Sequence, residues 1–111
     1  MNTNKLLMEM GISPDLTGYY YLVAAINLRK EKIMSGDVTH KFMDLYTEIA
    51  KKFNSTCVNV ERAMRHAVEK AFELNNDLLC KTFGSMVDKN SGKVTVSCFI
   101  GTLAELLIEE G

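Results

Sequence analysis

The stretch at 47–72, TEIAKKFNSTCVNVERAMRHAVEKAF, constrains the fold more than any other part of this chain. It is typical of a short helix, a tight polar turn and a longer helix, with Thr47 capping the first helix and Thr56 capping the second. The side chains of Asn54, Ser55 and Thr56 compete with a helix for backbone hydrogen bonds, and this explains the break. The longer helix is expected over about 57–74. A short helix, a turn and a longer helix with a free polar N-terminal end is the layout of a DNA-binding helix-turn-helix.

The longer helix is predicted to have one buried face and one polar face. Apolar residues recur along it at helical spacing, which predicts a stripe packed against the core. That stripe comprises Val60, Ala63, Met64, Ala67, Val68, Ala71 and Phe72. The opposite face carries Asn59, Glu61, Arg62, Arg65, His66 and Glu69. The two faces together predict a helix that lies on the surface of the core and presents charged groups outward.

The remaining segments also predict helices. Thr39 and Asp77 are candidate caps, Gly11 and Gly84 are candidate stops, and DKNSG at 88–92 is a turn. That turn could be the tip of a hairpin, but its flanks are too short to require strands. The expected helices cover about 3–10, 17–34, 39–46, 78–83 and 95–109, besides the helix-turn-helix. We therefore predict a single all-α domain over 1–111, with about six helices in a compact bundle.

Three consecutive tyrosines, Tyr19, Tyr20 and Tyr21, allow two interpretations. Stacked aromatic side chains are one way to bind single-stranded nucleic acid. Adjacent helical residues, however, point in different directions. We therefore favour the interpretation that one or two of these rings pack in the core and the others lie on the surface.

Composition excludes several classes of protein. Of the 111 residues, 47% are apolar and only one is proline, which favours a compact helical fold over disorder. No apolar run approaches the roughly 18 residues that cross a bilayer, and the first residues lack a secretory pattern. We expect a cytoplasmic protein with no membrane partner.

Sequence motifs do not favour an enzyme or a metal site. The chain lacks a glycine-rich phosphate loop, HExxH and GxSxG. Helical side-chain pairs account for the single acid–base cluster: Glu61 and Arg65 form an i,i+4 pair in the favourable order, and Arg62 can reach His66 or Glu69. Cys57, Cys80 and Cys98 are widely spaced without a CxxC pair, so we interpret them as reduced thiols. We predict no catalytic residues, no metal and no cofactor.

Charge is unevenly distributed. The net charge of −1 is unusual for a DNA-binding domain. Between Lys51 and Lys70, however, five positive residues stand against two negative ones, and Arg29, Lys30 and Lys32 form a second basic cluster. Weak non-specific DNA affinity is the expected consequence, because phosphate neutralisation supplies most of it.

The first two turns of the longer helix are the candidate base contacts, because such a helix enters the major groove N-terminal end first. Arginine bonds guanine, glutamate accepts from cytosine and asparagine pairs best with adenine. The candidate base-contacting residues are Asn59, Glu61, Arg62 and Arg65. The candidate backbone-contacting or supporting residues are Lys51, Lys52, Ser55, Thr56, Val58 and His66.

Two segments also carry a family resemblance: EIAKKFNST at 48–56 and VERAMRHAVE at 60–69. They resemble the effector domain of the stage-zero sporulation response regulator of endospore-forming bacteria, and GYYYLVAAI at 18–26 resembles its second helix. The resemblance implies a transcription regulator that binds duplex DNA as a homodimer or in tandem on paired boxes, with RNA polymerase as a further partner. It also implies that Glu61 and Arg62 contact bases, and that Arg65 and His66 support them or touch the backbone.

The chain departs from that family pattern in two ways. Val58 and Asn59 stand where the family has Ser-Arg, so one arginine and one phosphate-contacting serine are replaced. No receiver domain fits within 111 residues, so the chain corresponds to an excised effector domain or to a stand-alone form. These departures leave an alternative open: a protein-interaction module that pairs with or antagonises a full-length regulator without productive DNA recognition. The last helix, from Thr95 onward, is the candidate protein–protein surface.

Overall fold

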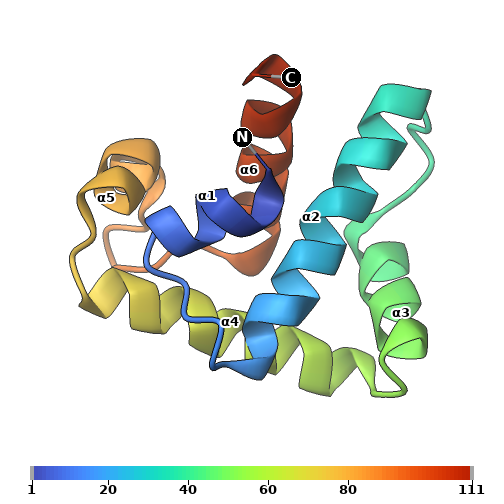
Figure 1. The fold of residues 1–111 in the computed structure, drawn as a ribbon, viewed down its shortest axis with the longest axis horizontal. Helices are drawn as coiled ribbons and strands as arrows, with labels where there is room; N and C mark the ends of the chain where they lie inside the picture. The colour runs from blue at the N-terminus through green and yellow to red at the C-terminus, as the bar shows by residue number, and fades with distance from the viewer. Residues whose placement is uncertain (1, 111) are drawn as a thin grey trace.

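The computed structural model describes residues 2–110, which form six α-helices and one short 3-10 helix (Figure 1). No β-strand occurs within those residues, so the all-α prediction is confirmed. None of the described helices combines the length and apolarity that crossing a membrane requires. In order, the elements are α1 (Thr3–Glu9), α2 (Thr17–Ser35), α3 (Phe42–Lys52), α4 (Cys57–Glu73), α5 (Asp77–Phe83), η1 (Gly84–Met86) and α6 (Val96–Glu110).

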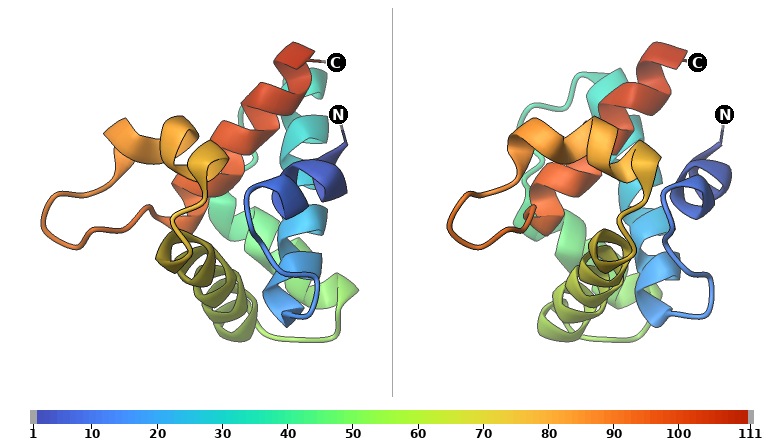
Figure 2. Two further views of the ribbon diagram at one scale, coloured as in Figure 1. Left: turned by 60° about the vertical axis from the view of Figure 1, so that its left-hand side comes forward. Right: turned by 90° about the vertical axis from the view of Figure 1, so that its left-hand side faces the viewer.

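Helix α2 is the centre of the packing. It contacts α1, α3, α4 and α6, and its inner face buries Leu22, Ala25 and Ile26 completely. Helix α6 runs beside it, while α4 lies across the base of the molecule (Figures 1 and 2). Close approach to α4 requires Gly18, because a Cβ atom there would lie 2.1 Å from the carbonyl oxygen of Ala63. The interior is one cluster of apolar side chains to which every α-helix contributes.

The prediction of two helices over 39–53 is wrong, because the structure has one helix there, α3. Thr47 does not cap a helix; its hydroxyl donates to the carbonyl oxygen of Met43 at 2.9 Å, a bond that an interior threonine can make without breaking the helix. Thr39 is not a cap either, because its hydroxyl and its backbone N–H both donate to Asp37. The start of α3 is instead stabilised by Asp44, whose carboxylate accepts the backbone N–H of Lys41 at 3.0 Å.

Helix α5 begins one residue earlier than predicted. Asn76, and not Asp77, is the N-cap, since its side-chain oxygen accepts the N–H of Leu79 at 3.0 Å. The amide nitrogen of Asn76 also donates to the carbonyl oxygen of Glu9 at 2.9 Å. One side chain therefore caps α5 and ties it to the end of α1, a double role that only the tertiary fold creates.

The three tyrosines behave as favoured from the sequence. Tyr19 and Tyr21 are buried, and Tyr21 packs edge-to-face on Phe53. Tyr20 is 54% exposed. The run is therefore not a stacking platform.

The C-terminal part is a turn followed by a largely buried helix. The 88–92 segment is a turn without flanking strands, closed by the N–H of Asp88 donating to the carbonyl oxygen of Lys93 at 3.0 Å. The Thr95 hydroxyl accepts the N–H of Cys98 at the start of α6. Phe99, Ile100 and Leu103 are fully buried. Most of the apolar face of α6 is thus used inside the fold, whereas Glu105, Glu109 and Glu110 are exposed.

Candidate nucleic-acid interface

A sharp turn joins α3 to α4, as the sequence predicted. Asn54 adopts a left-handed conformation (φ 53°), which asparagine tolerates better than most residues, and the N–H of Ser55 donates to Ala50 at 2.8 Å. Thr56 then caps α4, because its hydroxyl accepts the N–H of Asn59 at 3.1 Å. The helix-turn-helix prediction is confirmed, and α4 ends at Glu73, one residue before the predicted limit.

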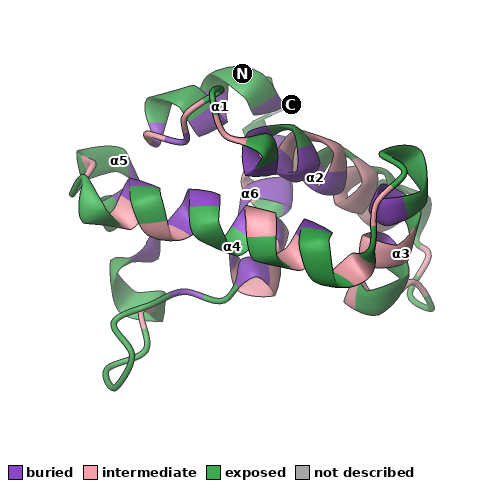
Figure 3. Ribbon diagram, turned by 90° about the horizontal axis from the view of Figure 1, so that it is seen from below, coloured by how far each residue is buried: buried purple, intermediate pink, exposed green. Residues whose placement is uncertain are grey.

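Helix α4 has one buried face and one exposed face along its length. Val60, Met64, Ala67, Val68 and Ala71 are buried against the core. Figure 3 looks at the molecule from below and shows α4 across the front, with exposed positions along it. The outer face of α4, defined by Val58, Asn59, Arg62, Arg65 and His66, is exposed throughout.

Two charged residues of α4 are oriented by one another. Nη1 of Arg65 donates to both carboxylate oxygens of Glu61, at 3.0 and 2.9 Å, so the predicted i,i+4 pair is confirmed. An exposed pair of this kind contributes only about 0.3–0.5 kcal/mol to stability. Its main effect is to fix where a donor and an acceptor lie on the surface of α4.

Arg62 differs from Arg65 because it forms no ion pair within residues 2–110. Glu69, which the sequence placed within reach of Arg62 together with His66, binds Lys93, with Nζ and Oε2 2.7 Å apart. No local pattern predicts that pair, because Lys93 follows a separate turn. Arg62 is consequently an exposed cation in the second turn of α4, available to a ligand.

The segment before α6 forms a wall beside α4. Asp88, Ser91 and Lys93 stand opposite Glu61, Arg65 and Glu69 across an open groove of about 320 Å³. Backbone N–H groups of Ser91 and Asn90 donate to Asp88, and they lower the pKa of its carboxyl below the ordinary 3.8. This groove was not predicted, because its two sides come from distant parts of the chain.

The predicted backbone-contacting residues gather around the start of α4. Lys51 and Lys52 are exposed in the last turn of α3, Thr56 is exposed at the cap, and Ser55 is half-buried between them. The N-terminal end of a helix carries a partial positive charge that favours anions. Two exposed lysines therefore lie shortly before this helix N-terminus in the chain, and Nζ of Lys52 lies 5.9 Å from the centroid of the Phe53 ring.

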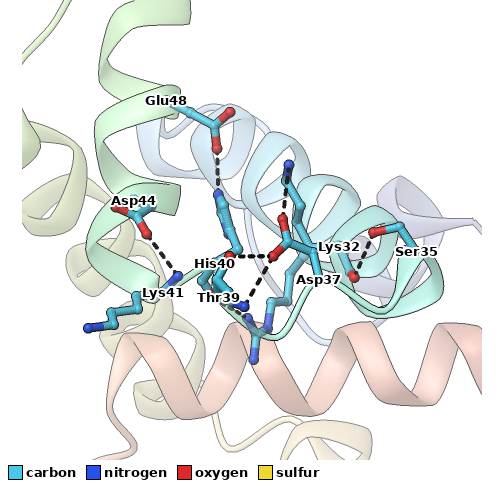
Figure 4. A network of polar contacts seen from close by, with 9 residues as sticks. Lys32, Ser35, Asp37, Thr39, His40, Lys41, Asp44 and Glu48 are labelled. Atoms are coloured by element: carbon cyan, nitrogen blue, oxygen red, sulfur yellow. Dashed lines mark hydrogen bonds and ion pairs between the residues drawn. The ribbon is translucent and has the colours of Figure 1, made fainter.

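The second basic cluster lies elsewhere and has a structural role (Figure 4). The Arg29 guanidinium lies 4.6 Å from the centroid of the Phe42 ring and donates to the carbonyl oxygen of His40. Lys32 pairs with Asp37 at 3.9 Å. Arg29 and Lys32 therefore fix the loop between α2 and α3 instead of extending the basic surface of α4.

His40 extends that support to α3. Its Nε2 lies 2.6 Å from a carboxylate oxygen of Glu48, which belongs to the second half of α3 (Figure 4). Nearby, the hydroxyl and the N–H of Thr39 lower the pKa of Asp37. The loop between α2 and α3 is thus held by polar contacts at both ends, which stabilises the position of α3 beside α4.

An apolar hollow of about 380 Å³ opens beside the first turn of α4. Burial, with help from the charge of Glu61, raises the pKa of the Tyr46 phenol in this hollow above 10.0. Cys57 is a free thiol there, as are Cys80 and Cys98 elsewhere. The hollow is lined by Met43, Tyr46, Cys57, Val58 and Glu61.

Comparison with known protein families adds an independent finding. The family model described as "Sporulation initiation factor Spo0A C terminal" matches residues 3–107. The match covers nearly the whole chain and includes the complete α3–α4 unit. The chain therefore belongs to the family of C-terminal domains of the sporulation initiation factor Spo0A, a family of DNA-binding transcription-factor domains.

Proposed function

We propose that this protein binds duplex DNA sequence-specifically in the cytoplasm, with α4 in the major groove. The observation that carries the proposal is the exposed Arg62 in the second turn of α4, which forms no ion pair within residues 2–110. An arginine at that place can bond O6 and N7 of a guanine. The proposed base contacts are Asn59, Glu61, Arg62 and Arg65.

Phosphate contacts would come from the turn and the helix end beside it. Lys51 and Lys52 would supply charge, Ser55 and Thr56 would supply polar groups at the turn, and His66 would supply one further along α4. Such contacts position a protein on DNA without specifying the sequence. Because the basic groups are few, we expect moderate affinity with a clear dependence on salt.

Two copies are proposed to bind paired boxes, either as a homodimer or in tandem. The spacing between half-sites follows the geometry of the protein copies, so paired boxes require a second copy at a set distance. RNA polymerase is a further proposed partner on the strength of the family. The number of protein copies bound to a duplex with one box, compared with a duplex with two boxes, tests whether two copies bind paired boxes.

The decisive experiment is fluorescence anisotropy with a labelled duplex carrying paired sporulation-regulator boxes and a scrambled duplex of equal length, over a range of salt concentrations. We expect specific binding that weakens as salt rises. Arg62→Ala should weaken specific binding by about 1–3 kcal/mol, roughly 5- to 150-fold, and relax specificity at one base pair.

Lys5→Ala is the matched control for that variant. Lys5 is an exposed cation on α1, and that helix lies apart from α4 (Figure 3), so its loss should leave binding unchanged. Equal and weak binding of the parent chain to both duplexes would contradict the proposal.

Two observations favour a second function. The Glu61 carboxylate already engages Arg65, and the whole chain has a net charge of −1. Both features weaken attraction to DNA and fit a module that pairs with or antagonises a full-length regulator. If Arg62→Ala and Arg65→Ala leave DNA retention unchanged, co-sedimentation with a full-length regulator is the measurement that tests this alternative.

A further inference from the structure

An apolar side chain stands among the polar groups of the proposed DNA-binding face. Val58, in the first turn of α4, is 63% exposed. Beside it, Met43 is 65% exposed at the rim of the hollow described above. The N-terminal residues of a recognition helix are the ones that contact base edges in the major groove.

Position on the helix connects Val58 to the proposed base contacts. Val58 precedes Arg62 by four residues, so the two side chains lie on the same face, one turn apart. The turn that Val58 occupies is the one capped by Thr56, at the end that enters the groove first. The apolar hollow therefore continues directly into the proposed DNA interface.

Base chemistry restricts what Val58 can recognise. Its isopropyl group can neither donate nor accept a hydrogen bond, so it cannot replace a phosphate-contacting serine. In the major groove the apolar feature of the four base pairs is the C5-methyl group of thymine. Val58, the methionine at the rim and Cys57 together offer that methyl an apolar surface.

We propose that Val58, backed by the hollow between α3 and α4, contacts the C5-methyl group of a thymine and is a specificity-determining residue. This inference rests on the proposed function of α4 in DNA recognition, and it names one base that α4 selects.

Replacing thymine with deoxyuridine tests the contact, because the substitution removes only the methyl group. A duplex is first selected from a randomised pool with the unaltered chain, and each thymine is then replaced in turn. Burial of one methyl-sized group contributes about 0.8 kcal/mol, or roughly a fourfold change in Kd. We expect one position, next to the base pair contacted by Arg62, to lose about fourfold in affinity.

Two serine variants assign the effect to its residue. Val58→Ser should bind the thymine and uracil duplexes equally while remaining folded, since the side chain is exposed. Val38→Ser is the matched control: Val38 is 94% exposed in the loop at the far end of α2 from Gly18 and α4. It should keep the fourfold preference of the parent chain.

Three results overturn the inference. The first is that the selected duplexes show no enriched thymine, and the second is that the parent chain binds equally well with uracil at every position. The third is that the preference for thymine persists in Val58→Ser. Each of these results excludes a contact from this side chain. If selection enriches no duplex at all, the proposed function fails as well. An enriched duplex that is indifferent to uracil removes only the methyl contact.

Discussion

The two arginines in the middle of α4 would contribute unequally to the proposed DNA recognition. Arg62 is exposed and forms no ion pair in the described part of the chain, whereas Arg65 is already held by both oxygens of Glu61. A base that bonds Arg65 must share it with a carboxylate or displace that carboxylate. Arg62 therefore carries more of the proposed recognition energy than Arg65.

Asn59 should shift the base preference at its position from guanine to adenine. Its side chain is exposed in the first turn of α4, and the asparagine amide matches N6 and N7 of adenine, whereas an arginine matches guanine. A binding survey over all four base pairs at that position should rank adenine first, by about 1–3 kcal/mol over the others. Asn59→Arg serves as the control and should make guanine the preferred base at that position. Guanine still ranking first for the parent chain would disprove the assignment.

At the scale of the element, α4 is positioned by its partner helices more than by its own sequence. Its buried stripe packs on α2, and the two backbones approach closely where Gly18 faces Ala63. The position of α3 relative to α4 is determined by the turn at Asn54 and by the polar contacts around His40. The exposed face of α4 depends on all of these contacts for its direction.

Gly18→Ala should destabilise the fold by about 1–3 kcal/mol or more, because the added Cβ meets a backbone oxygen 2.1 Å away and not a flexible side chain. Urea unfolding followed by circular dichroism measures the change.

Gly84→Ala is the matched control, since Gly84 has a right-handed helical backbone and nothing lies within 4 Å of the added atom. Its stability should stay within about 0.5 kcal/mol of the parent. Equal urea midpoints for the two variants would show that α2 and α4 approach less closely than described.

At the scale of the molecule, acid stability depends on carboxylates held by their own loops. Asp88 and Asp37 both have a lowered pKa because nearby N–H and O–H groups donate to the charged form. The folded chain thus binds these protons more weakly than the unfolded chain does. Their stabilising effect is complete above the ordinary pKa of 3.8 and is lost as the pH falls through the lower folded values.

We expect the urea midpoint to fall as the pH drops below about 4. Asp88→Asn keeps an oxygen that accepts the same two N–H groups but does not titrate, so its midpoint should fall less steeply with pH than that of the parent. Midpoints measured from pH 7 to 2.5 test this. Parallel profiles for the two proteins would rule out Asp88 as a contributor.

The sequence by itself determined the elements that depend on local chemistry. Helical spacing predicted the buried stripe of α4, and hydrogen-bonding side chains after α3 predicted the break and the Thr56 cap. The Glu61–Arg65 pair was also predictable, because residues four apart on a helix are neighbours. These features require only contacts between residues close in the chain.

Tertiary structure decided what depends on residues far apart. Asn76, and not Asp77, caps α5, and its amide also reaches the carbonyl oxygen of Glu9 at the end of α1. Glu69 pairs with Lys93, and the segment that carries Lys93 lines a groove beside α4. Local spacing cannot encode such choices, because each is a competition among partners that only the folded chain brings within reach.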